Sequence, residues 1–586
     1  MISPDPRDQS WGDPPLPPWV TSFRPSQLDA VEEIVENIDN GVRFNILDAP
    51  TGTGKTLIGE MVRRQIGGAR RGIYVCTTKT LQDQFAADFP YAKVLKGRAN
   101  YPTLDHPHLF NDRFKPLTAG DCTKRKTELP ACSGCDMGEI TEEKVLHCEN
   151  CHPWYRCPYE QAKIQAIQHP LAVTNTAYFL GESNSVGRIA DKRDLTIVDE
   201  CDTLESILMG QVEVSLSARF RKKYDIDVPQ QKTKPESWLE WCEYEALPKI
   251  GRAIEKMQNP RTVDEIKELR TLNNALHRLS IMHSQMTDEH GVGWIYSGMD
   301  DDGFKARKRS SRADEENCEF KPVRVDAVAG DFVWQHGKNW LLMSGTIIDP
   351  HEFVESLGIT EEWALVKVPN VFPAENRPVH IAPVASMTNK EKETAWPLMV
   401  EGIAAVCRLH PDERVLVHTV SYAFTQYVFD VLRKTDLMKR LVVYSGARDR
   451  EQALDLYKSI EGSVLLGPSM DRGVDLPGDL CRVQVICKVP FLNLGDPQVK
   501  ARLYSMGGER WYAVQTVRTL VQMCGRGVRS KDDHCHTYIL DTQFVTNLWN
   551  KSKMLLPGWF KDAFNWSGKD RLTMAANATD PGGPGG

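Results

Sequence analysis

The sequence predicts an α/β protein with two parallel-sheet domains and two insertions in the first of them. Short apolar runs alternate with helix-length segments over residues 23–96, and the same alternation returns after Trp340. Strands separated in this way are typical of parallel sheets. The alternation is interrupted by a cysteine-rich stretch and by a longer, largely helical one. We expect a flexible lead-in (1–20), a first parallel-sheet domain (21–97, 161–203 and 326–349), a cysteine-rich metal-binding insertion (98–160), a helical insertion (204–325), a second parallel-sheet domain (350–572) and a disordered tail (573–586).

Length and composition exclude several classes of protein. The chain has 586 residues, enough for about three or four domains, which excludes a small single-domain binder. Its 72 Lys and Arg against 79 Asp and Glu give a net charge of −7, which argues against a protein that coats nucleic acid by charge alone. The N-terminus is rich in proline, and apolar runs are all shorter than a membrane span. We therefore expect a cytoplasmic protein with no membrane partner.

The segment LDAPTGTGKT predicts a phosphate-binding loop. The apolar residues Phe44, Ile46 and Leu47 predict a strand directly before it, and Leu57, Ile58 and Met61 fall at helical spacing after it. Backbone N–H groups in such a loop and at the helix N-terminus cradle phosphates. Lys55 would reach the β and γ oxygens, and Thr56 would hold Mg²⁺. The nucleotide-binding residues expected from the loop are Ala49 (where the usual pattern has glycine), Pro50, Thr51, Gly52, Thr53, Gly54, Lys55 and Thr56.

Two acidic residues follow the apolar strand around Ile197 and Val198. An acid at the carboxyl edge of a strand beside a phosphate loop binds Mg²⁺, and its neighbour orients and deprotonates the attacking water. We assign Asp199 to the metal and Glu200 to the base.

The segment QMCGRGVRS supplies a third group of polar residues, far along the chain. Arg526 and Arg529 are three residues apart, so on a helix they would share one face and stabilise the charge that develops on a γ-phosphate. With Gln522 beside them, they predict a catalytic site shared between the two domains.

Six cysteines fall within one 36-residue window and predict a metal site. The knuckles ACSGC and HCENC are separated by 12 residues, a spacing typical of a zinc ribbon. The four zinc ligands in that interpretation are Cys132, Cys135, Cys148 and Cys151.

The second insertion and the second domain are predicted from periodicity. Leu269, Leu272, Leu276 and Leu279 recur at helical spacing. After Trp340, the strand-like runs WLLMSGT, RVLVHTV, RLVVYSG, SVLLGPS and CRVQVICKVPF are separated by helix-length segments.

Taken together, these motifs resemble the XPD/DinG family of iron–sulfur helicases in superfamily 2, over most of residues 23–544. The matching segments include FRPSQ, CTTKTLQDQ, MSGT, LVHTVSY and MDRGVDLPG. The resemblance implies two RecA-like motor domains, an arch-like role for the helical insertion, and ATP as cofactor. It also implies that Arg24 and Gln27 contact the adenine base and that Gly473 and Asp475 belong to the nucleotide site.

The cysteine module departs from the family pattern. The family's first cluster ligand follows a KGRxNY segment, whereas this sequence has Thr103 there. The resemblance implies a [4Fe-4S] cluster held by Cys122, Cys132, Cys135 and Cys157. The zinc set remains the alternative, and either metal would hold together a small module with few apolar residues.

The resemblance implies an ATP-dependent DNA helicase that moves 5′ to 3′ on single-stranded DNA and opens duplex junctions. We expect a monomeric motor that acts in a bacterial or virus-infected host cell. A phage member of the family fits this expectation. Two alternatives stay open: an ATP-driven single-strand translocase or remodeller without duplex unwinding, and a metal-cluster nucleic-acid-binding scaffold whose ATPase is vestigial.

Overall fold

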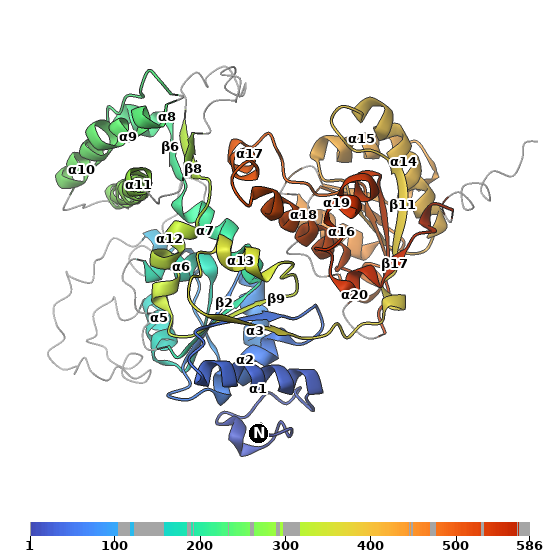
Figure 1. Cartoon of the computed structure of the whole chain (residues 1–586), viewed down its shortest axis with the longest axis horizontal. Coiled ribbons are helices and arrows are strands. Elements are labelled where there is room, and N and C mark those ends of the chain that lie inside the picture. Colours follow the sequence, from blue (N-terminus) through green and yellow to red (C-terminus); the bar gives the residue numbers. More distant parts are fainter. Residues whose placement is uncertain are drawn as a thin grey trace, which may run out of the picture.

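The computed structural model describes residues 2–103, 118–121, 157–184, 189–190, 193–232, 234–257, 263–288, 293–296, 317–444, 446, 449–468, 476–528, 532–570 and 572. Within these residues lie two seven-stranded parallel sheets and a three-stranded antiparallel sheet. The two parallel sheets confirm the predicted α/β class with two domains (Figure 1).

The first domain is built on a sheet with the strand order β10-β1-β9-β5-β2-β4-β3. Its strands are β1 (Phe44–Asp48), β2 (Gly72–Cys76), β3 (Lys93–Val94), β4 (Leu171–Asn175), β5 (Leu195–Asp199), β9 (Trp340–Ser344) and β10 (Trp363–Lys367). Its helices are α1 (Pro25–Asp39), α2 (Lys55–Gln65), α3 (Lys79–Asp88), α5 (Pro158–Gln168), α6 (Thr176–Ser183), α7 (Leu204–Val212), α12 (Asp326–Phe332) and α13 (Pro350–Ser356).

Both faces of the first sheet are buried, as parallel sheets require. Successive side chains of a strand point to opposite faces, so Ile73 and Val75 of β2 enter one core while Tyr74 and Cys76 enter the other. Residues of α1, α2 and α3 fill the second of these cores. Tyr74 therefore lies on the face that is covered by α2, the helix that begins at Lys55.

The second domain repeats this arrangement with the strand order β13-β14-β12-β15-β16-β11-β17. Its strands are β11 (Val379–Ala385), β12 (Val415–His418), β13 (Leu441–Val443), β14 (Val464–Gly467), β15 (Val483–Ile486), β16 (His536–Asp541) and β17 (Phe564–Asn565). Its helices are α14 (Lys392–Leu409), α15 (Tyr422–Leu432), α16 (Arg450–Ser459), α17 (Pro497–Leu503), α18 (Gly508–Cys524), α19 (Asn550–Ser552) and α20 (Gly558–Lys561).

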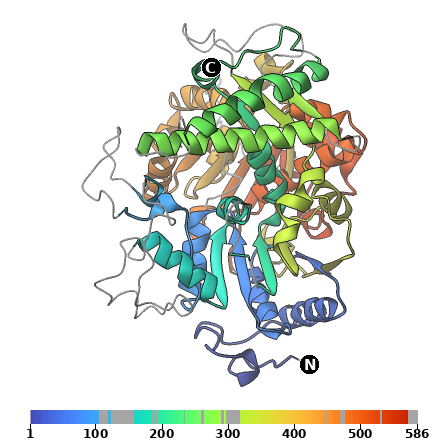
Figure 2. The same ribbon diagram turned by 90° about the vertical axis from the view of Figure 1, so that its left-hand side faces the viewer.

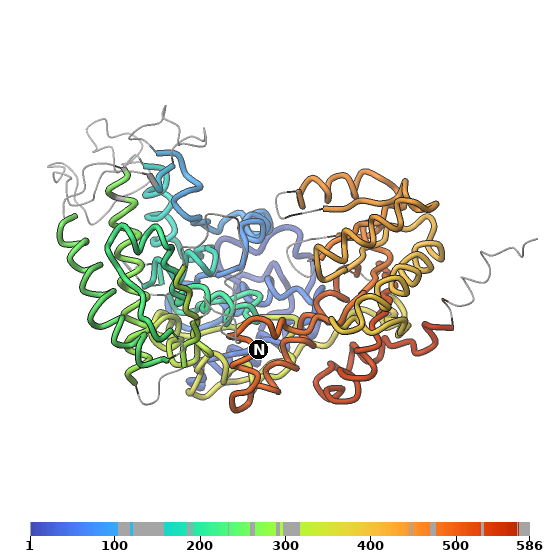
Figure 3. Tube along the Cα trace, turned by 90° about the horizontal axis from the view of Figure 1, so that it is seen from above, coloured from blue at the N-terminus to red at the C-terminus, as the bar shows by residue number. Residues whose placement is uncertain are grey.

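The segment between α7 and α12 combines helices with an antiparallel sheet of order β6-β8-β7, which the sequence did not predict. Its strands are β6 (Val214–Leu216), β7 (Trp294–Tyr296) and β8 (Cys318–Pro322), and its helices are α8 (Ala218–Lys223), α9 (Pro235–Glu240), α10 (Leu247–Lys256) and α11 (Val263–Thr287), with a π-helical stretch (Trp241–Ala246) between α9 and α10. Strands β6 and β7 have only three residues each, too few for an alternation to be recognised in the sequence. Helices α8–α11 lie at the end of the molecule that is farthest from α14 and α15 of the second domain (Figure 3), whereas α17 of the second domain lies beside β8 (Figure 1), and α11 runs across the upper part of the molecule (Figure 2).

The prediction of a flexible lead-in at residues 1–20 is wrong for the described residues 2–20. Trp11, Leu16 and Val20 are buried in the core formed with α1 and α2. Arg64 of α2 donates to the carbonyl oxygens of Trp11 and Pro14 at 2.8 and 2.7 Å. The segment is polar and rich in proline, so its sequence did not indicate that Trp11, Leu16 and Val20 would be buried against α1 and α2.

The predicted disordered tail (573–586) and most of the cysteine-rich insertion lie outside the described residues. In the part of the chain that the structure describes, no helix combines the length and apolar character needed to cross a bilayer.

Candidate nucleotide site

The three motifs of the first domain converge because their strands are neighbours. Strand β9 lies between β1 and β5, with Asp48 opposite Ser344 and Asp199 opposite Met343. The carboxyl ends of parallel strands meet at one edge of a sheet, where α/β proteins bind ligands. The phosphate loop, the MSGT segment and the two acids therefore share that edge.

The phosphate loop is a tight turn between β1 and α2. Gly52 and Gly54 both adopt left-handed backbone conformations, with φ of +84°. Thr53 closes the turn by donating its hydroxyl to the carbonyl oxygen of Pro50 at 2.7 Å, and the Ala49 N–H donates to the Ser344 carbonyl oxygen at 2.9 Å. The loop ends at Lys55, the first residue of α2, and Thr56 follows it. The N-terminus of α2 thus presents its N–H groups at this edge, as phosphate binding requires.

Arg24 and Gln27 lie against this loop. Gln27 donates its amide to the Thr53 carbonyl oxygen at 2.9 Å and accepts from the Arg24 N–H at 3.0 Å. The Arg24 guanidinium donates to the carbonyl oxygen of Gly52. The two residues that the resemblance assigns to the adenine base thus connect α1 to the phosphate loop.

Tyr74 contacts both of the predicted metal-binding residues, Asp199 and Thr56. The Tyr74 hydroxyl donates to Asp199 Oδ2 at 2.6 Å and also interacts with the Thr56 hydroxyl. Burial, and then the Asp199 carboxylate, raise the pKa of Tyr74 well above its usual value. Tyr74 therefore remains a neutral donor that fixes the orientation of Asp199. The Asp199 and Thr56 oxygens suit Mg²⁺, which prefers oxygen ligands.

Glu200 adopts a left-handed conformation with φ of +51°, which is uncommon for a residue with a side chain. Its N–H donates to Asp199 Oδ1 at 2.9 Å, and Thr77 lies 3.4 Å from Glu200 Oε2 through its hydroxyl. Because of this sharp turn, the consecutive residues Asp199 and Glu200 both present their carboxylates at the end of β5.

The second domain reaches this edge through Gln522 near the end of α18. The Gln522 amide donates to Asp202 Oδ2 at 2.8 Å and to the Thr346 hydroxyl at 2.9 Å. The Ser344 hydroxyl donates to Asp202 Oδ1 at 2.7 Å. Gln522 is therefore in contact with the segments that follow both β5 and β9.

The prediction that Arg526 lies on a helix is wrong. Helix α18 ends at Cys524 and Gly525 caps it, so Arg526 lies in the following turn and not on the helix. Gly527 has no room for a side chain there, because a Cβ atom would lie 2.3 Å from Cys535 Sγ. Arg529, Gly473 and Asp475 lie outside the described residues.

Phe372, from the segment that joins the two domains, also contacts the phosphate loop. Its ring belongs to a buried cluster of the second domain that includes Leu416 and Tyr444. A Cβ atom on Gly52 would lie 2.1 Å from the end of this ring, so the ring fits only against glycine. One aromatic side chain thus links the phosphate loop to the core of the second domain.

Of the predicted cysteine ligands, only Cys157 lies within the described residues. Its buried side chain precedes the first turn of α5, and a helix N-terminus favours a thiolate ligand. Cys122, Cys132, Cys135, Cys148 and Cys151 lie outside the described residues. Accordingly, the described residues contain no set of three or more His, Cys, Asp or Glu side chains placed to hold a metal ion.

Sequence reasoning missed Tyr74, Asp202 and Phe372 as parts of the site. Asp202 lies two residues after Glu200 in the segment VDECD, so this position in the sequence could have indicated it. Phe372 belongs to the segment VFPAENRP, which also resembles the family, whereas Tyr74 lies in a strand without motif character; only their long-range contacts show that both residues belong to the site.

Two family models match the chain. Residues 21–220 match the family described as type III restriction enzyme, res subunit, and residues 403–563 match the helicase C-terminal domain family. The first match contains the phosphate loop and the acids, and the second contains Gln522 and Arg526.

Relatives and solved structures agree with these matches. The ATP-dependent DNA helicase YoaA of Escherichia coli is 22% identical over 90% of this chain and 92% of its own length, and the ATP-dependent DNA helicase DinG of Photobacterium profundum is 25% identical over 40% of this chain and 36% of its own. A solved structure named XPD_Helicase superimposes with a TM-score of 0.57 at 15% identity, covering 91% of this chain and 98% of that one. Together these matches support an XPD/DinG-like helicase of superfamily 2, the family that the sequence motifs resemble.

Proposed function

We propose that the protein is an ATP-dependent DNA helicase that moves along single-stranded DNA in the 5′ to 3′ direction and opens duplex junctions. The observation that carries the proposal is the contact of Gln522 with Asp202 and Thr346. It brings the second domain to the edge where the phosphate loop and the two acids of the first domain meet. The names of the relatives support DNA as the substrate.

Each residue of the site has a role in hydrolysis. Lys55 and the loop N–H groups bind the phosphates, while Thr56 and Asp199 hold Mg²⁺, which would neutralise phosphate charge when bound. Glu200 orients the attacking water and accepts its proton. Arg526 and Arg529, supplied by the second domain, stabilise the charge on the γ-phosphate. Residues on both domains are then needed for one reaction, so hydrolysis is coupled to domain closure.

Alternating closure and opening of the two domains would advance the DNA strand. Binding of ATP draws Arg526 toward the phosphate loop, and release of the cleaved phosphate after hydrolysis removes the charge that attracts it. The exposed Lys79 and Thr80 at the start of α3, in the segment CTTKTLQDQ, are available to contact the strand, whereas Gln82 is buried and bonded to the Leu95 carbonyl oxygen. Within this segment, Lys79 and Thr80 are therefore better placed than Gln82 to contact the DNA strand.

For the cysteine module we propose a [4Fe-4S] cluster on Cys122, Cys132, Cys135 and Cys157, which supports a wedge at the strand-separation point. The buried position of Cys157 at the start of α5 supports its assignment as a ligand. Zinc on Cys132, Cys135, Cys148 and Cys151 is the alternative. Anaerobic purification followed by metal analysis separates them: about four iron atoms per chain support the cluster, and one zinc atom with no visible absorption supports the ribbon.

ATP hydrolysis with and without single-stranded DNA tests the motor. The wild-type protein should be stimulated by DNA, and Lys55→Ala and Glu200→Gln should each lower kcat at least about 100-fold. Hydrolysis that survives Glu200→Gln unchanged would favour the scaffold with a vestigial ATPase.

Strand displacement tests the direction and the second alternative. A duplex with a 5′ single-stranded tail should be opened and one with a 3′ tail should not. Removal of streptavidin from a single-stranded end without any strand displacement would instead identify a translocase. We further propose a monomeric motor in the cytoplasm, and sedimentation of the DNA-bound protein tests the monomeric state.

A further inference from the structure

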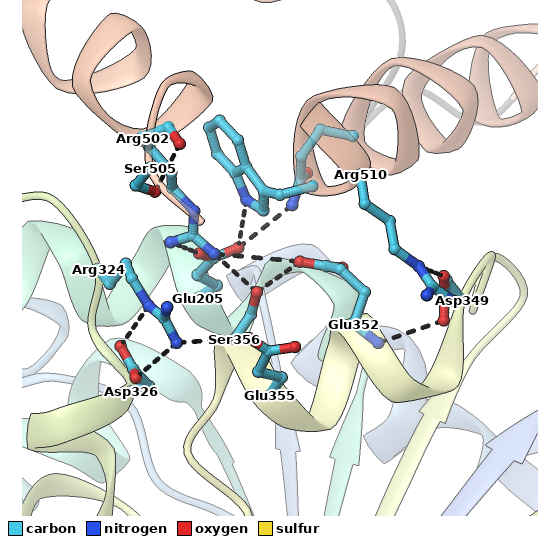
Figure 4. A network of polar contacts seen from close by, with 12 residues as sticks. Glu205, Arg324, Asp326, Asp349, Glu352, Glu355, Ser356, Arg502, Ser505 and Arg510 are labelled. Atoms are coloured by element: carbon cyan, nitrogen blue, oxygen red, sulfur yellow. Dashed lines mark hydrogen bonds and ion pairs between the residues drawn. The ribbon is translucent and has the colours of Figure 1, made fainter. Parts of the chain in front are cut away.

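A buried polar cluster joins the two domains at a distance from the phosphate loop. We call it the interdomain cluster and define it as Glu205 of α7, Glu352 and Ser356 of α13, Arg502 of α17, and Trp511 and Gln515 of α18. Figure 4 shows Arg502 descending from the second domain between Glu205 and Ser356 of the first.

Arg502 is the centre of this cluster. Its guanidinium forms an ion pair with Glu205 at 2.5 Å and donates to the Ser356 hydroxyl at 2.7 Å. The same group lies 4.4 Å from the centre of the Trp511 ring. The side chains of Arg502 and Glu205 are only 5% and 13% exposed, so water screens their attraction weakly.

Glu205 also accepts hydrogen bonds from side chains of α18. The Trp511 indole N–H donates to Glu205 Oε2 at 3.3 Å, and the Gln515 amide donates to the same oxygen at 3.2 Å. Glu205 lies one residue after the start of α7, which follows the short turn after Glu200. Glu205, which accepts these hydrogen bonds from α18, therefore belongs to the same segment as Glu200, the proposed catalytic base.

Helices α17 and α18 form a fixed corner. A Cβ atom on Gly508 would lie 1.9 Å from the Arg502 carbonyl oxygen, which shows how closely the start of α18 packs on the end of α17. From that corner α18 runs without interruption to Gln522, which contacts Asp202 and Thr346. A helix transmits a displacement of its first turns to its last ones. The position of Arg502 thus sets the position of Gln522 and of Arg526 just beyond it.

We propose that Arg502 and Glu205 are positioning residues for ATP hydrolysis, which hold α18 so that Gln522 and Arg526 meet the nucleotide. The proposal rests on the ATPase function proposed above. Arginine suits this place because its planar group engages two acceptors and stacks on an aromatic ring at once, which lysine cannot do.

The chain offers a matched control in Arg510. It lies on α18 in the same interface and pairs with Asp349; its own side chain is 59% exposed, and that of Asp349 is 4% exposed. Water screens the charge of the exposed Arg510 guanidinium, so this pair contributes less than the buried pair of Arg502 and Glu205. Arg510→Ala should therefore leave kcat within about twofold of wild type.

Steady-state hydrolysis with saturating single-stranded DNA tests the proposal. Arg502→Ala should lower kcat by about tenfold to 100-fold and leave KM for ATP within about threefold, because the phosphate loop belongs to the first domain. Arg502→Lys keeps a positive charge beside Glu205, so it keeps the fold, and it should still lower kcat about threefold to tenfold. If Arg502→Ala fails to fold, Arg502→Lys alone decides the matter.

A double variant separates positioning from mere stability. If Arg502 acts through α18, the losses in kcat caused by Arg502→Lys and by Gln522→Ala should not multiply, so the double variant should lose clearly less than the product of the two single losses. Independent effects that multiply, or a normal kcat in Arg502→Lys, would overturn the proposal. An inactive wild-type protein that Lys55→Ala leaves unchanged would instead refute the ATPase function itself.

Discussion

The free energy of unfolding of the Glu352→Gln variant should depend less on pH than that of the wild-type protein. Glu352 lies in the interdomain cluster with a side chain that is 7% exposed. Burial, and then the nearby Glu205 carboxylate, raise its pKa from 4.5 to about 7, against the opposing effects of Arg518, Ser356 and Arg502. The groups that face it thus come from α7, α17 and α18 as well as from its own helix.

The sign follows from proton binding. Between pH 4.5 and about 7 the folded protein keeps a proton on Glu352 that the unfolded chain has lost. The free energy of unfolding therefore falls as pH rises through this window. A shift from 4.5 to about 7 corresponds to about 3 kcal/mol in full, of which about 2 kcal/mol develops between pH 5.5 and pH 8.

Urea denaturation at pH 5.5 and pH 8 measures this difference. An amide side chain cannot ionise, so the Glu352→Gln variant should lose about 2 kcal/mol less unfolding free energy between the two pH values than the wild-type protein. Glu355→Gln, on the same helix but with a side chain 67% exposed, should follow the wild type. Equal pH dependence in wild type and Glu352→Gln would refute the reasoning, because it would show that Glu352 is ionised throughout.

Three further perturbations test other contacts. Tyr74→Phe removes the hydrogen bond to Asp199 and should raise the Mg²⁺ concentration needed for half-maximal hydrolysis about threefold to tenfold, measured by magnesium titration, with an unchanged melting temperature. Phe372→Ala removes the ring from Gly52 and should raise KM for ATP in steady-state assays, whereas Phe372→Leu should do so less. Arg64→Ala removes the donor to Trp11 and Pro14 and should lower the unfolding free energy by about 2 to 4 kcal/mol; limited proteolysis should then cut within residues 2–20 first.

The local parts of the site were predictable because each is encoded in a few consecutive residues. The phosphate loop and the acids follow apolar strands, so strand, turn and helix signals coincide around Lys55 and Glu200. The fold class followed from the same alternation of strands and helices.

The remainder depends on contacts between distant segments. Tyr74 reaches Asp199 across 125 residues, and Gln522 reaches Asp202 across 320, distances in sequence at which no periodic pattern carries information. Trp11 lies in a proline-rich segment that resembles a flexible end until its burial is seen. The end of α18 at Cys524 was missed because a glycine cap and a continuing helix look alike over so few residues.

The chain crosses between the two domains once, through the segment that contains Phe372, and that crossing lies beside the phosphate loop. Near the end of this segment, Arg377 donates to the carbonyl oxygens of Phe372 at 3.2 Å and Trp559 at 2.6 Å, which holds the segment against the second domain. The crossing and α17 lie at opposite ends of the interface (Figure 1). The second domain therefore contacts the first at two widely separated points, through Phe372 at Gly52 and through Arg502 of α17 at Glu205, so any relative movement of the two domains has to change at least one of these contacts.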